Sequence, residues 1–149
     1  MTGIAFREAT REDVPAMQVV RHLVKENVLS DPSLVPDSDC IRYLEVRGKG
    51  WVGHDGAQLA GFAIADLVDH SIWALFVDPL YEGLGIGKEL HRLMMDWYFT
   101  QTSETVWLST AYDTRAERFY RLQGWTDAGA YSTRERRFTM TVDQWRQRR

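Results

Sequence analysis

Residues 77 to 88 read Val77-Asp78-Pro79-Leu80-Tyr81-Glu82-Gly83-Leu84-Gly85-Ile86-Gly87-Lys88. Glycines at alternate positions allow the backbone to turn sharply and to approach a ligand closely. They lead into a predicted helix, whose first N–H groups have no partner inside the helix and whose dipole adds partial positive charge. The stretch therefore predicts a binding site for a phosphate or a pyrophosphate group.

Two common glycine loops do not fit this stretch. The Walker pattern G-x-x-x-x-G-K-S/T, if it ended on Gly87-Lys88, would have Glu82 at its first glycine and Glu89 at its Ser/Thr. The dinucleotide pattern G-x-G-x-x-G would have Lys88 or Leu90 at its last glycine. A glycine-rich turn that binds no ligand stays open as an alternative.

The segments on either side of the loop predict a buried strand and an amphipathic helix. Ser71–Val77 is almost continuously apolar, which is typical of a strand at the centre of a sheet. The helix is expected to extend to about Phe99, with a buried stripe at the spacing of one helix face. That stripe consists of Ile86, Leu90, Leu93, Met94, Trp97 and Tyr98.

The rest of the chain predicts further short elements. Thr10 has the features of a helix N-cap, with Asp13 three residues later. Thr114 and Glu117 have capping-box spacing at the start of another helix. The expected strands are Ile4–Glu8, Trp51–His54, Leu59–Leu67 and Val106–Thr110, with one or two more in 125–145, of which Arg136–Thr141 is the clearest. The expected helices are Thr10–Val28, Asp39–Val46 and Thr114–Gln123.

This order of elements predicts one domain over residues 1–149 with a mixed α/β layered fold rather than a strict βαβ alternation. A net charge of -3 argues against nucleic acid as a partner. The single cysteine, Cys40, fits a reducing compartment, and a nucleophilic role for it is the less favoured alternative. No apolar stretch approaches membrane-spanning length and the first residues lack a signal-peptide pattern, so we expect a cytoplasmic protein without a membrane partner.

Two motifs resemble those of one enzyme family. Glu82-Gly83-Leu84-Gly85-Ile86-Gly87 is similar to the pattern Q/R-x-x-G-x-G/A. Residues 113 to 125, DTRAERFYRLQGW, are similar to N-x-x-A-x-x-F-Y-x-x-x-G-F/W, with Asp113 in place of the Asn. In both motifs, and in their order and separation, the chain resembles the GNAT superfamily, the GCN5-related N-acetyltransferases. The resemblance implies a mostly antiparallel central sheet of about six to seven strands flanked by about four helices.

The same resemblance implies transfer of an acetyl group from acetyl-CoA to a primary amine of a small molecule or peptide, directly in a ternary complex and without a metal. The backbone of Leu75, Phe76 and Val77 would pair with the pantetheine arm, and Asp113 would lie beside that arm. Tyr120 would protonate the leaving thiolate, which is chemically reasonable for a nearby hydroxyl, and a backbone N–H near Val77 could stabilise the developing oxyanion. The amides that would hold the pyrophosphate are those of Gly83, Leu84, Gly85, Ile86, Gly87 and Lys88.

Two departures from the family pattern add negative charge near the predicted cofactor site. Glu82 stands where the family has Arg or Gln, and Asp113 replaces Asn. Lys88, Arg92 or Arg115 could compensate. The departures keep open a non-catalytic acyl-CoA-binding or sensory module of the same fold, and transfer to a hydroxyl or a thiol is a third alternative.

The sequence does not identify the general base or the acceptor amine. The two strands that carry a catalytic Glu in some family members have no ionisable residue at the matching positions here. Candidate bases are Asp66, His70, Glu26 and His22, and a base is unnecessary if the amine loses its proton on binding. An acidic region with Glu26, Asp31, Asp37 and Asp39 hints at a cationic amine, and Trp51, Trp73 and Trp107 are candidates for lining a cleft. The resemblance also makes a homodimer an open expectation.

Overall fold

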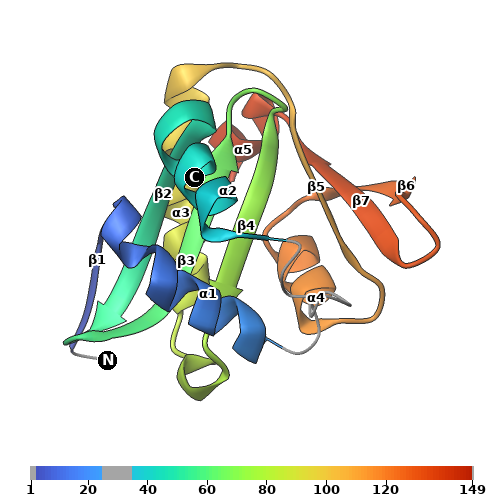
Figure 1. Cartoon of the computed structure of the whole chain (residues 1–149). Helices are drawn as coiled ribbons and strands as arrows, with labels where there is room; N and C mark the ends of the chain where they lie inside the picture. Colours follow the sequence, from blue (N-terminus) through green and yellow to red (C-terminus); the bar gives the residue numbers. More distant parts are fainter. Residues whose placement is uncertain (1–2, 25–34, 149) are drawn as a thin grey trace.

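A seven-stranded sheet forms the centre of the computed structural model, which describes residues 3–24 and 35–148 (Figure 1). The strand order is β1-β2-β3-β4-β5-β7-β6, and neighbours are antiparallel except for β4 and β5. This is the mixed α/β, mostly antiparallel sheet that the sequence predicts. The strands are β1 (Ile4–Glu8), β2 (Gly48–Asp55), β3 (Gln58–Asp66), β4 (Ser71–Val77), β5 (Val106–Ala111), β6 (Thr126–Ala130) and β7 (Glu135–Met140).

Helices cover both faces of the sheet. The α-helices among the described residues are α1 (Val14–Leu23), α2 (Asp37–Arg42), α3 (Ile86–Gln101), α4 (Arg115–Leu122) and α5 (Val142–Gln147). Short turns of other helix types are η1 (Arg11–Asp13), η4 (Tyr43–Arg47) and η5 (Pro79–Tyr81). Alternation along β3 builds two cores: Phe62 and Ile64 pack with α1 and α2, while Ala63 and Ala65 pack with α3 on the other face.

The parallel strands β4 and β5 separate soon after they meet. Their Cα pairing is confined to Ser71 and Trp107. Towards the C-terminal end of β4 the strands diverge, and α4 lies in the space between them (Figure 1). The burial of β4 follows this geometry, because Ser71 and Ile72 are buried whereas Leu75–Val77 are only half-buried. The divergence therefore opens one edge of a central strand.

Two sequence predictions about helices need correction. The predicted helix Thr10–Val28 ends earlier, because Val24 already has an extended backbone, and residues 25–28 lie outside the described part. Leu23 is 43% exposed, so a longer α1 would bury little more apolar surface. The segment predicted as strand up to Trp145 instead ends in α5. A capping box between Thr141 and Gln144 starts this helix, and Trp145 is buried against the core.

His91 on α3 is an uncharged part of the core. It is 1% exposed, and its Nε2 accepts a hydrogen bond from Trp125 Nε1 at 2.9 Å. The rings of Phe119 and Trp145 pack edge-on against it. Burial and, to a smaller extent, the positive charge of Arg148 together lower the pKa of His91 to about 3. The imidazole therefore stays neutral in the native protein at pH values where a free histidine is protonated.

We expect the protein to lose stability as the pH falls from 7 to 5. Below about pH 6.5 the unfolded chain binds a proton at His91, while the native state binds none until about pH 3. The free energy of unfolding should therefore fall by about 2 kcal/mol between pH 7 and pH 5 from this group. His91→Gln keeps an acceptor for Trp125 but does not titrate, so urea unfolding of this variant should show a flatter pH profile. An equally steep loss in the variant would contradict this assignment.

Candidate active site

The glycine loop owes its shape to two residues with left-handed backbone. The side chain of Asp78 accepts a hydrogen bond from the Leu80 amide at 2.9 Å and starts the turn η5. Gly83 (φ +79°) and Gly85 (φ +81°) then reverse the chain direction before α3 begins. Residues with a Cβ rarely adopt such φ values, so the glycines are required by the path of the backbone.

The start of α3 presents amides without intrahelical partners. The amide of Glu89 donates to the Gly85 carbonyl at 3.1 Å, whereas the amides of Ile86, Gly87 and Lys88 precede the first complete turn. The N-cap is Gly85, which has no side chain to satisfy them. These N–H groups and the helix dipole favour an anionic ligand at this point.

The open edge of β4 lies next to this helix start. The Asp78 amide donates to the Ala60 carbonyl at 2.8 Å, so Asp78 faces β3, and Phe76 faces β3 as well because backbone direction alternates along a strand. The N–H and C=O groups of Leu75 and Val77 therefore point to the other edge, where β5 has diverged. An extended ligand can pair with this edge as an added strand would.

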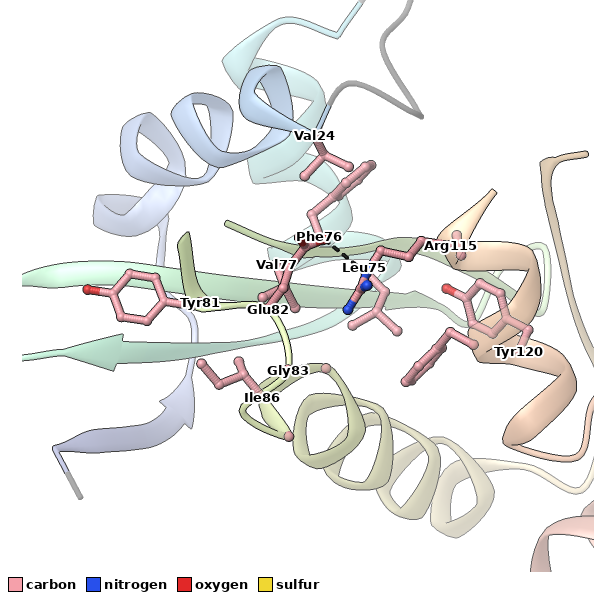
Figure 2. A pocket seen from close by; sticks show the side chains of 14 residues that line it. Val24, Leu75, Phe76, Val77, Tyr81, Glu82, Gly83, Ile86, Arg115 and Tyr120 are labelled. Carbon is pink, nitrogen blue, oxygen red and sulfur yellow. Dashed lines mark ion pairs between the residues drawn. The ribbon is translucent and has the colours of Figure 1, made fainter. Parts of the chain in front are cut away.

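A cavity of about 270 Å³ joins the glycine loop to the open edge (Figure 2). We call it the loop cavity. It is bounded by β4 and the loop on one side and by α4 on the other. Its lining consists of Val24, Leu75, Phe76, Val77, Tyr81, Glu82, Gly83, Gly85, Ile86, Gly87, Arg115, Ala116, Phe119 and Tyr120.

Most of the predicted site residues meet in this cavity. Leu75, Phe76, Val77, Gly83, Gly85, Ile86, Gly87 and Tyr120 line it. Leu84 and Lys88 are not part of the lining, although Lys88 lines a neighbouring hollow of about 430 Å³ beside α3. Asp113 is exposed at the turn before α4. Its φ of +60° is one that Asp and Asn tolerate, so its position in the turn has a backbone reason, and its contact with the pantetheine arm stays a prediction.

Tyr120 has an unengaged hydroxyl at the wall of the loop cavity. The residue is 6% exposed, and its ring packs against Phe119, Trp125 and Phe138. Within residues 3–24 and 35–148, the hydroxyl has no hydrogen-bond partner, and Figure 2 shows it on the side of the ring that faces β4. Burial raises the pKa of Tyr120, so the hydroxyl keeps its proton at neutral pH. It is thus available to donate that proton.

An ion pair crosses the loop cavity. Arg115 Nε lies 3.0 Å from Glu82 Oε2 and links the first residue of α4 to the glycine loop (Figure 2). Arg115 therefore supplies the compensating charge that the sequence analysis sought for Glu82. Arg92, another candidate, is engaged along α3 with Glu89 and Asp96. Both Arg115 and Glu82 are more than a third exposed, so their pairing is weak and can be exchanged for a ligand.

A second cavity of about 270 Å³ lies between β4 and β5 on the other side of Tyr120. We call it the strand cavity. Four residues line both cavities: Leu75, Phe76, Ala116 and Tyr120. The remaining lining of the strand cavity consists of Arg21, Ser71, Ile72, Trp73, Ala74, Trp107, Leu108, Ser109, Thr110 and Glu135. Tyr120 thus forms part of the wall of both cavities.

Three of the candidate bases, Asp66, His70 and His22, line neither cavity. Asp66 is 1% exposed and paired with Arg47 at 2.7 Å, and His70 Nδ1 lies 2.9 Å from the hydroxyl of Tyr98. His22 is exposed on α1. Glu26 and Asp31 lie outside the described residues.

The acidic and aromatic residues singled out in the sequence do not come together at one site. Asp37 and Asp39 are exposed on α2 and line neither cavity. Of the three tryptophans, Trp73 and Trp107 line the strand cavity, while Trp51 is core. The charged residues that do line the strand cavity, Arg21 and Glu135, carry no local sequence signal and were missed.

Residues 3–24 and 35–148 contain neither a cluster of metal ligands nor a membrane-spanning helix. No three His, Cys, Asp or Glu side chains in this part of the chain are grouped so that they could hold a metal ion. Among the described helices, none has both the length and the apolar character that crossing a bilayer requires.

Comparisons with known proteins agree with this geometry. The model of the acetyltransferase (GNAT) family matches residues 17–125. No curated protein matches the chain by sequence. Among solved structures, the chain is similar to the ribosomal-protein-S18-alanine N-acetyltransferase from Escherichia coli, with 19% identity, a TM-score of 0.71, and coverage of 92% of this chain and 91% of that one.

Two further structures share the fold over nearly their whole length. PaiA N-acetyltransferase from Thermoplasma acidophilum, solved in complex with coenzyme A, has 12% identity and a TM-score of 0.77, with 93% of this chain and 99% of that chain covered. A GNAT-family acetyltransferase from Staphylococcus aureus Mu50 has 20% identity and a TM-score of 0.78, with the same coverage. At these identities the likeness concerns the fold.

Proposed function

The chain belongs to the acetyltransferase (GNAT) family, and from this premise we propose that it transfers an acetyl group from acetyl-CoA to a primary amine while both substrates are bound. The observation that carries the proposal is that Tyr120 lines both the loop cavity and the strand cavity, with a hydroxyl that has no hydrogen-bond partner among the described residues. One cavity suits the acyl donor and the other the acceptor, and the hydroxyl lies where they meet.

The residues of the loop cavity fit coenzyme A. Amides at the start of α3 would bind its diphosphate, and the open edge of β4 at Leu75 and Val77 would pair with the amide groups of its pantetheine arm. Arg115 can exchange Glu82 for the diphosphate, because both side chains line the same cavity. When bound, the thioester supplies the activated acetyl group.

The transfer requires one proton to move from nitrogen to sulfur. The amine nitrogen bonds to the acetyl carbon, the carbon–sulfur bond breaks, and the Tyr120 hydroxyl donates its proton to the departing sulfur. The proton released by the nitrogen restores the tyrosine through solvent. The N–H of Val77, directed to the open edge, is placed to stabilise charge that develops on the acetyl oxygen.

The proposal takes a small-molecule or peptide amine as acceptor and places the reaction in the cytoplasm. The single cysteine and the net charge of -3 support a reducing compartment and argue against nucleic acid as partner. The Escherichia coli enzyme named above is an N-acetyltransferase of a protein alanine, so the fold accommodates a protein amine there. A homodimer stays an expectation from the family.

Two measurements test the proposal. Acetyl-CoA at 100 times its dissociation constant should stabilise the protein by about 2.7 kcal/mol. Release of free thiol in the presence of amines then distinguishes an enzyme from a non-catalytic acyl-CoA-binding module, which would bind without turnover. Release with alcohols or thiols but never with amines would favour transfer to a different acceptor group.

Glu82→Gln should tighten coenzyme A binding by about two- to five-fold at low salt. The change removes a carboxylate close to the expected diphosphate and releases Arg115 to bind it, with the small effect typical of an exposed pair. The gain should shrink in high salt. Calorimetric titration measures it, with Glu45→Gln as the control, since Glu45 pairs with Arg11 away from both cavities. A weaker affinity in Glu82→Gln would mean that Glu82 itself assists binding.

A further inference from the structure

Arg21 is a half-buried cation in the wall of the strand cavity. Its Nε and Nη2 are buried, and neither has a hydrogen-bond partner within the described part of the chain. The guanidinium carbon lies 4.8 Å from the centre of the Phe76 ring and 5.1 Å from that of the Trp73 ring. Aromatic faces hold the group in place, but they do not satisfy its N–H donors.

Other half-buried arginines of the fold form an ion pair with a carboxylate. Arg47 pairs with Asp66 at 2.7 Å, and Arg136 pairs with Glu117 at 2.9 Å. For Arg21, the titratable neighbour among the described residues is the thiol of Cys40, which is a weak hydrogen-bond acceptor. Burial lowers the pKa of Arg21, yet a guanidinium stays charged at neutral pH. Within residues 3–24 and 35–148, Nε and Nη2 of this half-buried cation have no hydrogen-bond partner, which is costly, so the site favours the binding of an anion.

The same cavity contains one carboxylate. Glu135, at the start of β7, accepts a hydrogen bond from Ser109 Oγ at 3.2 Å and forms no ion pair with a described residue. Ser109 belongs to β5, whereas the rings under Arg21 belong to β4. The strand cavity therefore has a cation on its β4 side and an anion on its β5 side, with Tyr120 in its wall.

We propose that the strand cavity binds a small zwitterionic amine, whose carboxylate pairs with Arg21 and whose ammonium group is drawn in by Glu135. This inference rests on the proposed function, because it names the chemical class of its acceptor. A planar guanidinium binds a carboxylate through two parallel hydrogen bonds, which fixes the orientation of the guest. The volume of about 270 Å³ lies just below the usual range for drug-sized ligands, about 300–1,000 Å³, and suits a molecule the size of an amino acid.

The charges also argue against other amines. A diamine would bring a second cation towards Arg21, and an uncharged alkylamine would leave the guanidinium unpaired after water is displaced. The acidic residues Asp37 and Asp39, which suggested a cationic guest, line neither cavity.

A matched panel of amines tests whether the acceptor is a zwitterionic amine. It consists of glycine, β-alanine, 4-aminobutyrate and 5-aminopentanoate, the primary amide of each, and 1,3-diaminopropane, with thiol release measured at saturating acetyl-CoA. The best carboxylate should exceed its own amide in kcat/KM by about 10- to 100-fold, the range expected for hydrogen bonds to a charged group. Calorimetry with the coenzyme A-bound protein measures binding of the same compounds independently of turnover.

Three variants test whether the preference for carboxylates depends on the charge of Arg21. Arg21→Met keeps the length that packs on Trp73 and Phe76 but removes the charge, so kcat/KM for the carboxylate should fall to the level of its amide, mainly through KM. Arg21→Lys should retain part of the preference. Arg42→Met, on exposed α2 beside α1, removes a cation that lines neither cavity and should change nothing. An unchanged thermal shift with acetyl-CoA shows that each variant is folded and binds the donor.

The outcomes separate this inference from the proposed function. Turnover of amides or the diamine without preference for carboxylates overturns the inference and leaves the acetyltransferase proposal intact. Binding of a carboxylate that Arg21→Met abolishes, without turnover of any amine, supports the inference about recognition and overturns the proposed reaction. If no carboxylate in the panel is bound and none is turned over, the inference is overturned.

Discussion

Tyr120→Phe should slow acetyl transfer by about 10²- to 10⁴-fold and leave the affinity for acetyl-CoA unchanged. The range is the usual contribution of a positioned general acid. The lost hydroxyl forms no hydrogen bond within the described protein, so its removal breaks no native contact. Phenylalanine keeps the ring that packs on Trp125 and Phe138, and the wall between the two cavities stays in place.

Tyr98→Phe is the matched control. Its hydroxyl is bonded within the fold, 2.9 Å from His70 Nδ1 and 3.1 Å from the Glu104 carbonyl. Removing it should cost about 1–2 kcal/mol of stability without changing the rate. Thiol release and urea unfolding of both variants should therefore show opposite patterns, one losing rate and the other losing stability. Normal turnover in Tyr120→Phe would remove this hydroxyl from the chemistry.

Local features explain why much of the lining of the loop cavity was predictable. The left-handed glycines, the helix start and the buried strand β4 lie in one continuous stretch, so their chemistry could be read from neighbouring residues. The predicted bounds of β4 are confirmed residue by residue, whereas the predicted burial fails at Leu75–Val77, which are half-buried. The divergence of β5 from β4 was not predicted, because no residue pattern within either strand encodes it.

The lining of the strand cavity depends on contacts between distant segments. Arg21 and Glu135 lie near opposite ends of the chain, and only the packing of α1 and β7 around the divergent strands brings them to one cavity. Candidate bases such as Asp66 and His70 had suitable side chains, but tertiary contacts occupy them elsewhere. The partner of Glu82 could only be narrowed to Lys88, Arg92 or Arg115 from the sequence, because Arg115, which pairs with it, comes from another element.

The missed helix α5 has a different cause. Alternating polar and apolar residues in Arg136–Met140 predict a strand, and extending that pattern towards Trp145 hid the capping box at Thr141 and Gln144. The local signal was present but was outweighed by the preceding pattern. Short helices of this kind are stabilised mainly by tertiary contacts, here the burial of Trp145 and its hydrogen bond to Asp96.

Gly87→Val should reduce the affinity for acetyl-CoA by about 100-fold or more while leaving the fold intact. A Cβ at this position would lie 3.4 Å from Val77 Cγ2 and 3.8 Å from Phe119 Cε1, both ordinary contacts. Valine is also a slightly better helix former than glycine, so the stability of the free protein should stay equal or rise by a few tenths of a kcal/mol. The new methyl groups, however, point into the loop cavity, where the start of α3 is expected to meet the diphosphate.

Gly87→Ala and Gly85→Ala separate crowding from strain. The family pattern accepts alanine at residue 87, so Gly87→Ala should keep most of the affinity. Gly85→Ala places a Cβ in open space but at φ +81°, so it should cost about 1–2 kcal/mol of stability. Calorimetric titration with acetyl-CoA and urea unfolding measure the two quantities. If Gly87→Val binds as the wild type does, the diphosphate does not lie against the amides at the start of α3, and the donor assignment of the loop cavity loses its physical basis.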